Sequence, residues 1–183
     1  VACAFQLGEQ SNFQTGPLVY NGRMILTGVR STAVIDAQTC DLIWKHEWAP
    51  KAKESWLNNR GAAIKDGYLI RGTSDGYLLA LNLDSGKMLW ARRAANTAIG
   101  EAFTMAPLIF EDKILIGPAG SENGVPGWVG AFRLSDGQPL WRFRTVTPET
   151  WPNPKNIMLG GGAVWTPFSL DPEKAELFIA VTN

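Results

Sequence analysis

The stretch GPAGSENGVPGWVGAFRLSDGQPLW, residues Gly117–Trp141, decides how the chain folds. Its second half, AFRLSDGQPLW, combines an apolar segment, a turn marked by Asp136-Gly137 and a closing tryptophan. This pattern is typical of a β-hairpin, because Asp-Gly pairs accept the positive φ angles of tight hairpin turns. Its first half, GSENGVPGW, is a glycine-rich connection whose lone carboxylate, Glu122, has no evident structural role.

The hairpin pattern recurs along the chain without gaps. The three eleven-residue copies are Val34–Trp44 (VIDAQTCDLIW), Ala80–Trp90 (ALNLDSGKMLW) and Ala131–Trp141 (AFRLSDGQPLW). Their closing tryptophans are 46 and 51 residues apart. A second hairpin pattern precedes each copy, in the segments PLVYNGRMILTG (17–28), AAIKDGYLIRG (62–72) and APLIFEDKILIG (106–117), and a fourth such segment begins at Pro167.

Two hairpins in each repeat predict a four-stranded antiparallel sheet, and no window keeps the apolar spacing of an amphipathic helix. Four-stranded units that recur about every 40 to 50 residues are typical of β-propeller blades. We therefore predict an all-β fold, a partial β-propeller of about three and a half four-stranded blades. The expected blade units are roughly residues 16–48, 60–93, 104–145 and 165–183. The three repeat tryptophans are interpreted as packing between neighbouring sheets.

Composition excludes several classes of function. Seventeen basic and seventeen acidic residues cancel to a net charge of +0, so nucleic-acid binding is not expected. The apolar runs are far shorter than the roughly 20 residues of a membrane-spanning helix, which predicts a soluble chain without a transmembrane segment. No signal peptide is visible. Cys3 and Cys40 are too few for a disulfide framework and too far apart for a metal motif, so cysteine usage leaves the redox compartment open.

The repeat with its closing tryptophan resembles the tryptophan-docking motif of the eight-bladed quinoprotein propellers, the pyrroloquinoline quinone (PQQ)-dependent alcohol dehydrogenases. Three connections between the repeats narrow the resemblance, namely Asn59-Arg60-Gly61, GSENGV at 120–125 and GGGAVW at 160–165. The resemblance covers essentially the whole chain and implies the N-terminal part of a larger catalytic domain. It also implies a periplasmic or secreted location. The remaining propeller blades, or a second copy of the chain, are implied as partners, since the open sheets of an incomplete propeller invite association.

The resemblance implies a cofactor-binding site for PQQ made of five residues. Arg60 matches the family's cationic contact to the quinone, and a guanidinium there could hydrogen-bond the quinone oxygens. Thr104 matches a hydroxyl that contacts a PQQ carboxylate. Gly120 and Ser121 would supply backbone amides and a hydroxyl to a cofactor carboxylate. Trp165 matches the indole that forms the floor under the planar cofactor.

The resemblance also implies a metal site. Glu122 matches a carboxylate ligand to a calcium ion (Ca2+), or to a lanthanide in some family members, and Asn183 matches the amide-oxygen ligand to the same metal. Hard cations bind oxygen ligands, and the flanking glycines leave room around Glu122. The alternative for Glu122 is an ordinary exposed loop glutamate. Ala163 stands where many members have a threonine, so one hydrogen bond to the quinone is expected to be missing.

For the complete family protein the resemblance implies oxidation of a small-molecule alcohol by hydride transfer to the quinone. Electrons would then pass to cytochrome c or a membrane quinone. The family's catalytic aspartate lies shortly beyond the position of Asn183, so no catalytic residue is assigned within this chain and no turnover is expected from it alone. His46 is interpreted as a solvated edge residue rather than a general base.

One departure from the family pattern leaves alternatives open. Glu54-Ser55 stand where many members have adjacent cysteines whose ring covers the cofactor, so that lid cannot form. Trp56 is close by and could substitute, although the sequence offers no argument that it does. A sugar or polyol dehydrogenase of the same superfamily therefore remains an alternative. A cofactor-free propeller that serves as a protein-binding scaffold is an alternative from a different class.

Overall fold

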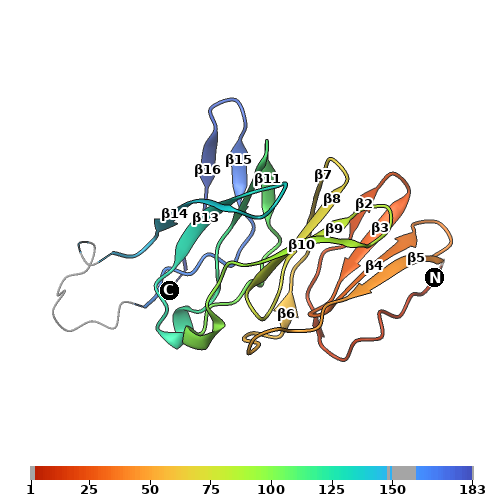
Figure 1. Cartoon of the computed structure of the whole chain (residues 1–183), viewed down its shortest axis with the longest axis horizontal. Coiled ribbons are helices and arrows are strands. Elements are labelled where there is room, and N and C mark those ends of the chain that lie inside the picture. The colour runs from red at the N-terminus through yellow and green to blue at the C-terminus, as the bar shows by residue number, and fades with distance from the viewer. Residues whose placement is uncertain (1–2, 148, 150–159, 183) are drawn as a thin grey trace.

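The computed structural model of the chain describes residues 3–147, 149 and 160–182. Three four-stranded antiparallel sheets follow one another in chain order, and a two-stranded hairpin comes after them (Figure 1). Each sheet is a meander whose strands are neighbours in sequence. This arrangement confirms the predicted all-β partial propeller with about three and a half blades.

The sheets are built from short strands. The first contains, in spatial order, β2 (Leu18–Tyr20), β3 (Arg23–Thr27), β4 (Ser31–Asp36) and β5 (Leu42–Glu47). The second contains β7 (Ala63–Lys65), β8 (Tyr68–Gly72), β9 (Tyr77–Asn82) and β10 (Met88–Arg93). The third contains β11 (Leu108–Phe110), β12 (Lys113–Ile116), β13 (Trp128–Arg133) and β14 (Pro139–Arg144). The final hairpin contains β15 (Ser169–Asp171) and β16 (Glu176–Phe178).

Two short strands and two single-turn helices lie in the connections of the described chain. β1 (Asn12–Phe13) pairs in parallel with β6 (Asn58–Asn59) and so fixes the N-terminal segment beside the entry to the second sheet. Two single-turn 3-10 helices, η1 (Thr97–Ile99) and η2 (Ser121–Asn123), lie between strands of the regular sheets. Among the described residues, no helix has the length and apolar character needed to cross a membrane.

The three sequence repeats fold into the same bulged hairpin. The first and last residues of each repeat face each other across its two strands, in the pairs Val34–Trp44, Ala80–Trp90 and Ala131–Trp141. A register shift lies beside each of these pairs, as expected for a β-bulge. The shared pattern of residues therefore specifies a shared backbone, including the position of each tryptophan on the last strand of its sheet.

Each of the first two repeat tryptophans docks on the outer turn of the next sheet. Trp44 donates its Nε1 hydrogen to the carbonyl of Leu83 at 3.0 Å. Its ring covers Gly86, where an added Cβ atom would lie only 2.5 Å from the indole. Trp90 donates to the carbonyl of Leu134 in the third sheet at 3.1 Å. Because both contacts join consecutive sheets, the interpretation of these two tryptophans as packing between sheets is confirmed.

Trp141 differs from the other repeat tryptophans. Its side chain is 46% exposed, and Phe143 on the same strand is 63% exposed. In the described part of the chain, no bulged repeat hairpin follows β14 to offer Trp141 a docking turn. The interpretation of Trp141 as a packed residue is therefore wrong for this chain, because docking needs the turn of a following sheet.

A buried arginine joins the first two sheets. Arg71 on β8 is fully buried, and its guanidinium donates to the carbonyls of Gly28, Val29 and Ser31 at 2.7, 2.7 and 2.6 Å. Burial lowers the pKa of Arg71 to about 10, which leaves it charged at neutral pH. Buried charge is tolerated where its hydrogen-bonding capacity is filled. The Gly72 carbonyl at 3.2 Å and the Thr32 hydroxyl at 3.0 Å accept the two remaining N–H groups of Arg71.

A disulfide joins Cys3 to Cys40, with the two Cα atoms 6.0 Å apart. The cysteine count alone did not predict this bond, because it depends on the N-terminal segment folding back onto the β4–β5 turn. Glu9 holds the same segment: its carboxylate accepts hydrogen bonds from the backbone N–H groups of Arg30 at 2.9 Å and Ser31 at 3.1 Å. The N-terminal segment is thus fastened to the first sheet at two separate points.

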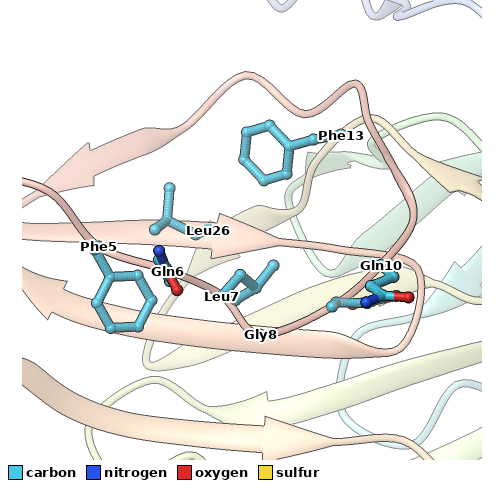
Figure 2. Close-up of a pocket in the computed structure, with 8 residues that line it drawn as sticks. Phe5, Gln6, Leu7, Gly8, Gln10, Phe13 and Leu26 are labelled. Atoms are coloured by element: carbon cyan, nitrogen blue, oxygen red, sulfur yellow. The ribbon is translucent and has the colours of Figure 1, made fainter.

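A hollow of about 550 Å³ lies between the N-terminal segment and β3. Figure 2 shows that residues 5–10 and Phe13 supply most of its lining and that Leu26 contributes from β3. Its one carboxylate, Glu9, is already bound to backbone N–H groups. The hollow is therefore the space left between the N-terminal segment and the first sheet. None of the predicted site residues lines it.

His46 on β5 needs a different description from the predicted one. It is half-buried, its Nε2 atom is buried without a hydrogen-bond partner, and burial lowers its pKa. The interpretation as a solvated edge residue is therefore wrong. His46 does not line the pocket that contains the predicted site residues. Its neighbours include Gly86 and Arg71 of the second sheet, so its imidazole belongs to the packing of the first sheet against the second.

Candidate functional site

Four of the seven residues predicted from the sequence line one pocket of about 140 Å³. The lining residues are Trp56, Asn58, Arg60, Thr104, Ala119, Glu122 and Trp165. They come from the connections that lead into the second, third and fourth units and from the loop after β12. Residues far apart in sequence therefore meet in one pocket.

The backbone around Arg60 is fixed by its neighbours. The Arg60 N–H donates to the carbonyl of Thr104 at 2.9 Å. The side chain of buried Asn59 donates to the carbonyl of Gly72 at 3.3 Å and accepts from the N–H of Gly61 at 3.0 Å. Gly61 has a φ of 137°, which a residue with a side chain rarely adopts. The Asn-Arg-Gly sequence thus sets the direction in which Arg60 leaves the backbone.

The guanidinium of Arg60 lies over the indole of Trp165, 4.8 Å from the ring centroid. Partial burial lowers the pKa of Arg60, and the group stays protonated at neutral pH because arginine titrates far above it. No carboxylate among the described residues lies within 4.0 Å of this cation. The pocket therefore contains a positive charge whose one defined contact is with an aromatic face.

Thr104 presents a buried hydroxyl to the same pocket. The residue is 2% exposed, and its Oγ1 atom has no hydrogen-bond partner within the described structure. A buried polar atom left without a partner is unusual and costs free energy, so it indicates a place where a ligand group or water completes the hydrogen bonding. The Thr104 carbonyl accepts a hydrogen bond from the Arg60 N–H, so the two backbones are adjacent, and both residues line the pocket.

Glu122 lies on η2, exposed at the edge of the pocket. Gly120 and Gly124 flank the helix with φ angles of 137° and 74°, so the chain turns sharply on both sides of the carboxylate. The side chain of Asn123 donates to the carbonyl of Gly100 at 3.1 Å and anchors the turn. Glu122 makes no ion pair among the described residues, which leaves its oxygens available.

Gly120 and Ser121 do not line the pocket in this structure. A Cβ atom at Gly120 would lie 2.7 Å from the carbonyl oxygen of Gly100, so the glycine permits a close backbone approach. The hydroxyl of Ser121 accepts a hydrogen bond from the N–H of Ala163 at 3.0 Å. Both residues therefore position neighbouring segments: Gly120 supports the Glu122 turn, and Ser121 supports the strand entry that carries Trp165.

The metal site predicted from the sequence is only partly described. Asn183 lies outside the described residues. Across residues 3–147, 149 and 160–182, no group of three or more His, Cys, Asp or Glu side chains is placed to hold a metal ion. Glu122 is thus a single carboxylate at the pocket edge, and any cation bound there would need further oxygen ligands from a bound molecule or from other parts of the protein.

Trp56 is a pocket residue that the sequence marked only as a possible substitute for the adjacent-cysteine lid, without an argument for that role. It is 41% exposed and lies outside the repeat positions, so neither periodicity nor the docking pattern marks it. Asn58 and Ala119 were not predicted either. The one sequence signal that could have indicated Asn58 and Ala119 is their position, since each lies within three residues of a predicted site residue.

The fold and the pocket define a class of protein: a β-propeller segment whose pocket combines an aromatic face, a cation and an unpartnered hydroxyl. The family model described as "PQQ: Glucose/ethanol/alcohol dehydrogenase, beta-propeller domain" matches residues 4–183. The chain belongs to this family of PQQ-dependent dehydrogenase propellers, which confirms the resemblance seen in its sequence.

Individual relatives agree with this assignment. The chain is 31% identical to quinohemoprotein alcohol dehydrogenase ADH IIB of Pseudomonas putida, over 100% of its own length and 30% of the relative. It is 29% identical to the lanthanide-dependent methanol dehydrogenase of Methylacidiphilum fumariolicum (strain SolV), over 100% of its own length and 35% of the relative. The solved structure of a europium-containing methanol dehydrogenase superimposes with a TM-score of 0.83 at 27% identity, over 94% of this chain and 35% of that one. The chain thus spans about a third of the length of these relatives.

Proposed function

We propose that the chain forms part of the PQQ site of an alcohol dehydrogenase and supplies the aromatic floor, the cationic contact and one metal ligand. The observation that carries this proposal is the convergence of Arg60, Thr104, Glu122 and Trp165 on one pocket. These residues come from four different connections, and packing of the sheets gives no separate reason for an unpaired cation, a partnerless hydroxyl and a free carboxylate to meet.

The residues present fit a planar, polyanionic quinone. The unpartnered Thr104 hydroxyl can donate to a carboxylate, and the Arg60 cation can attract the negative charge of the same molecule. Trp165 offers a flat face for stacking. In this structure the Arg60 guanidinium lies on that face, so a stacked ring requires the guanidinium to move toward the ring edge. Such a movement would also enlarge the pocket.

A bound PQQ would supply the hydride acceptor for oxidation of an alcohol, and a calcium or lanthanide ion would supply a Lewis acid beside it. Within the chain, Glu122 would ligate that cation as a hard oxygen donor. Arg60 would place positive charge beside the quinone oxygens, where negative charge increases during reduction. Glu122 is the one carboxylate among the described pocket residues, so we assign the general base to another part of the whole protein.

The activity of the whole protein is proposed on the same basis. Its substrate would be a small alcohol, and its electrons would pass to cytochrome c or a membrane quinone, in a periplasmic or secreted setting. The names of the relatives support an alcohol as the substrate class, since they describe alcohol and methanol dehydrogenases.

Chromophore retention tests the proposal. The chain is incubated with PQQ and calcium and then separated by gel filtration. We expect the visible absorbance of PQQ to elute with the protein, to fall on addition of a chelator, and to fall in Thr104→Val and Glu122→Gln. Glu173→Gln, an exposed glutamate in the β15–β16 turn, is the matched control and should behave as wild type. Protein that elutes without chromophore at saturating PQQ would contradict the proposal and favour a cofactor-free scaffold.

A further inference from the structure

Trp56 and Trp165 bring two indoles to one small pocket from different parts of the chain. Trp56 lies between β5 and β6, whereas Trp165 precedes β15. The side chain of Trp56 is 41% exposed, although burial of its large apolar surface would be favourable. Trp56 lines a pocket that also contains the unpaired Arg60 cation and the partnerless Thr104 hydroxyl.

The backbone of Trp56 is held in an unfavourable conformation. Its φ of 55° lies in the left-handed region, which bulky residues rarely occupy. The segment on its N-terminal side is tied down, since the Ser55 N–H donates to the carbonyl of Ser74 at 2.9 Å. On its C-terminal side the Asn58 N–H donates to the Trp56 carbonyl at 2.9 Å. Strained residues held by their surroundings are concentrated at ligand-binding positions.

The neighbouring Glu54 takes part in this restraint. Its carboxylate accepts a hydrogen bond from the Ser74 hydroxyl at 2.7 Å and forms an ion pair with Arg30. The Arg30 contact also lowers the pKa of Glu54, so the carboxylate stays ionised and bonded at neutral pH. Glu54 and Ser55 are therefore occupied in fixing the loop, and Trp56 is the residue of this loop that reaches the pocket.

We propose that Trp56 provides the second aromatic face of the site, so that the planar cofactor binds between the indoles of Trp56 and Trp165. This inference rests on the proposed PQQ function. Flat conjugated ligands gain affinity from each aromatic face they stack on, because contact area and ring electrostatics both contribute. The strained loop fixes the indole before binding, so little side-chain freedom is lost when the ligand arrives.

The test measures PQQ affinity by equilibrium dialysis in the presence of calcium and compares it with thermal unfolding of the same proteins. Trp56→Gly should weaken PQQ binding by about tenfold. Its thermal midpoint should not fall, because glycine adopts a φ of 55° without strain. Trp56→Phe should retain most of the affinity. Trp141→Ala is the matched control, since Trp141 is similarly exposed at 46% and lies outside the pocket, and it should bind PQQ as the wild type does.

The outcomes separate this inference from the function on which it rests. A wild-type chain that retains no PQQ overturns both. Wild-type affinity in Trp56→Gly, with PQQ still bound, overturns the role of Trp56 and leaves the PQQ site in place. Loss of affinity together with a lower thermal midpoint in both Trp56→Gly and Trp56→Phe shows a structural role and also overturns the inference.

Discussion

The indole of Trp44 lies directly against the backbone of Gly86, in a space that a single added carbon would fill. This contact joins the last strand of the first sheet to the outer turn of the second, beside the hydrogen bond from Trp44 to Leu83. The propeller segment is thus held together by a large ring on one unit and a missing side chain on the next. Trp44 is the closing residue of the first eleven-residue repeat, and Gly86 is the turn glycine of the second.

Gly86→Ala should destabilise the protein by about 2–3 kcal/mol, because the new Cβ atom overlaps the Trp44 ring and the residue has a φ of 68°. Gly67→Ala is the matched control: its φ is 79°, but nothing lies within 4 Å of an added Cβ. It should cost about 1 kcal/mol from backbone strain alone. Urea denaturation measures both, and equal losses would show that docking contributes nothing.

Arg71→Met should lower the free energy of unfolding by about 3–5 kcal/mol, because the buried carbonyls of Gly28, Val29 and Ser31 lose their donor. Arg71→Lys should recover only part of this loss, since an ammonium cannot reproduce the planar fork. The control is Arg23→Met, which removes an exposed ion pair with Asp84 and should change stability by less than about 1 kcal/mol. Denaturant midpoints of the three variants provide the comparison.

Glu9 should make folding sensitive to acid. Burial alone would raise the pKa of Glu9, but hydrogen bonds from Arg30 and Ser31 outweigh it and hold the pKa below the usual 4.5. The unfolded chain therefore binds a proton more readily, and the stabilisation present above 4.5 is lost as the pH falls through the folded pKa.

Thermal midpoints measured from neutral pH down to about pH 3 test this dependence. The decline with falling pH should be shallower in Glu9→Gln than in wild type. Identical slopes in the two proteins would show that Glu9 is not a source of the acid sensitivity.

Cys3→Ser should destabilise the oxidised protein by about 3–4 kcal/mol, because the disulfide closes a loop across 37 residues of sequence separation. Cys40→Gly removes the same bond but should cost less, since Cys40 has a φ of 64° that glycine adopts freely. Thermal unfolding with and without a reducing agent separates the two effects. Reduction should destabilise wild type and leave both variants unchanged.

The sequence predicted the repeating hairpins well because their determinants are local. The Asn21-Gly22 and Asp66-Gly67 turns have positive φ angles at both residues, as the pairs themselves require. The fixed distance from the turn to Trp44 and to Trp90 then placed both rings on a neighbouring sheet. Trp141 carries the same local pattern, but its environment depends on a following sheet, which no local pattern can supply.

The site was predictable to the extent that its residues lie in family motifs. Arg60 and Trp165 were predicted from motifs, yet their contact over 4.8 Å arises from the stacking of three units and is invisible in sequence. Trp56 could be named from sequence only as a possible substitute for the missing lid, because its orientation depends on a backbone conformation that tryptophan does not favour. The bond between Cys3 and Cys40 escaped prediction for a similar reason, since it is set by the path of the N-terminal segment.

Cys40 occupies the turn position at which the second and third sheets have Gly86 and Gly137, and its side chain is bonded to Cys3. The outer turn of the first sheet therefore has no bare backbone on which an incoming indole could settle. An indole that approached this turn as Trp44 approaches Gly86 would meet the Cys40 side chain instead of bare backbone. The disulfide therefore makes the first outer turn a covalent anchor for the N-terminal segment, whereas the second outer turn is a docking surface for a ring.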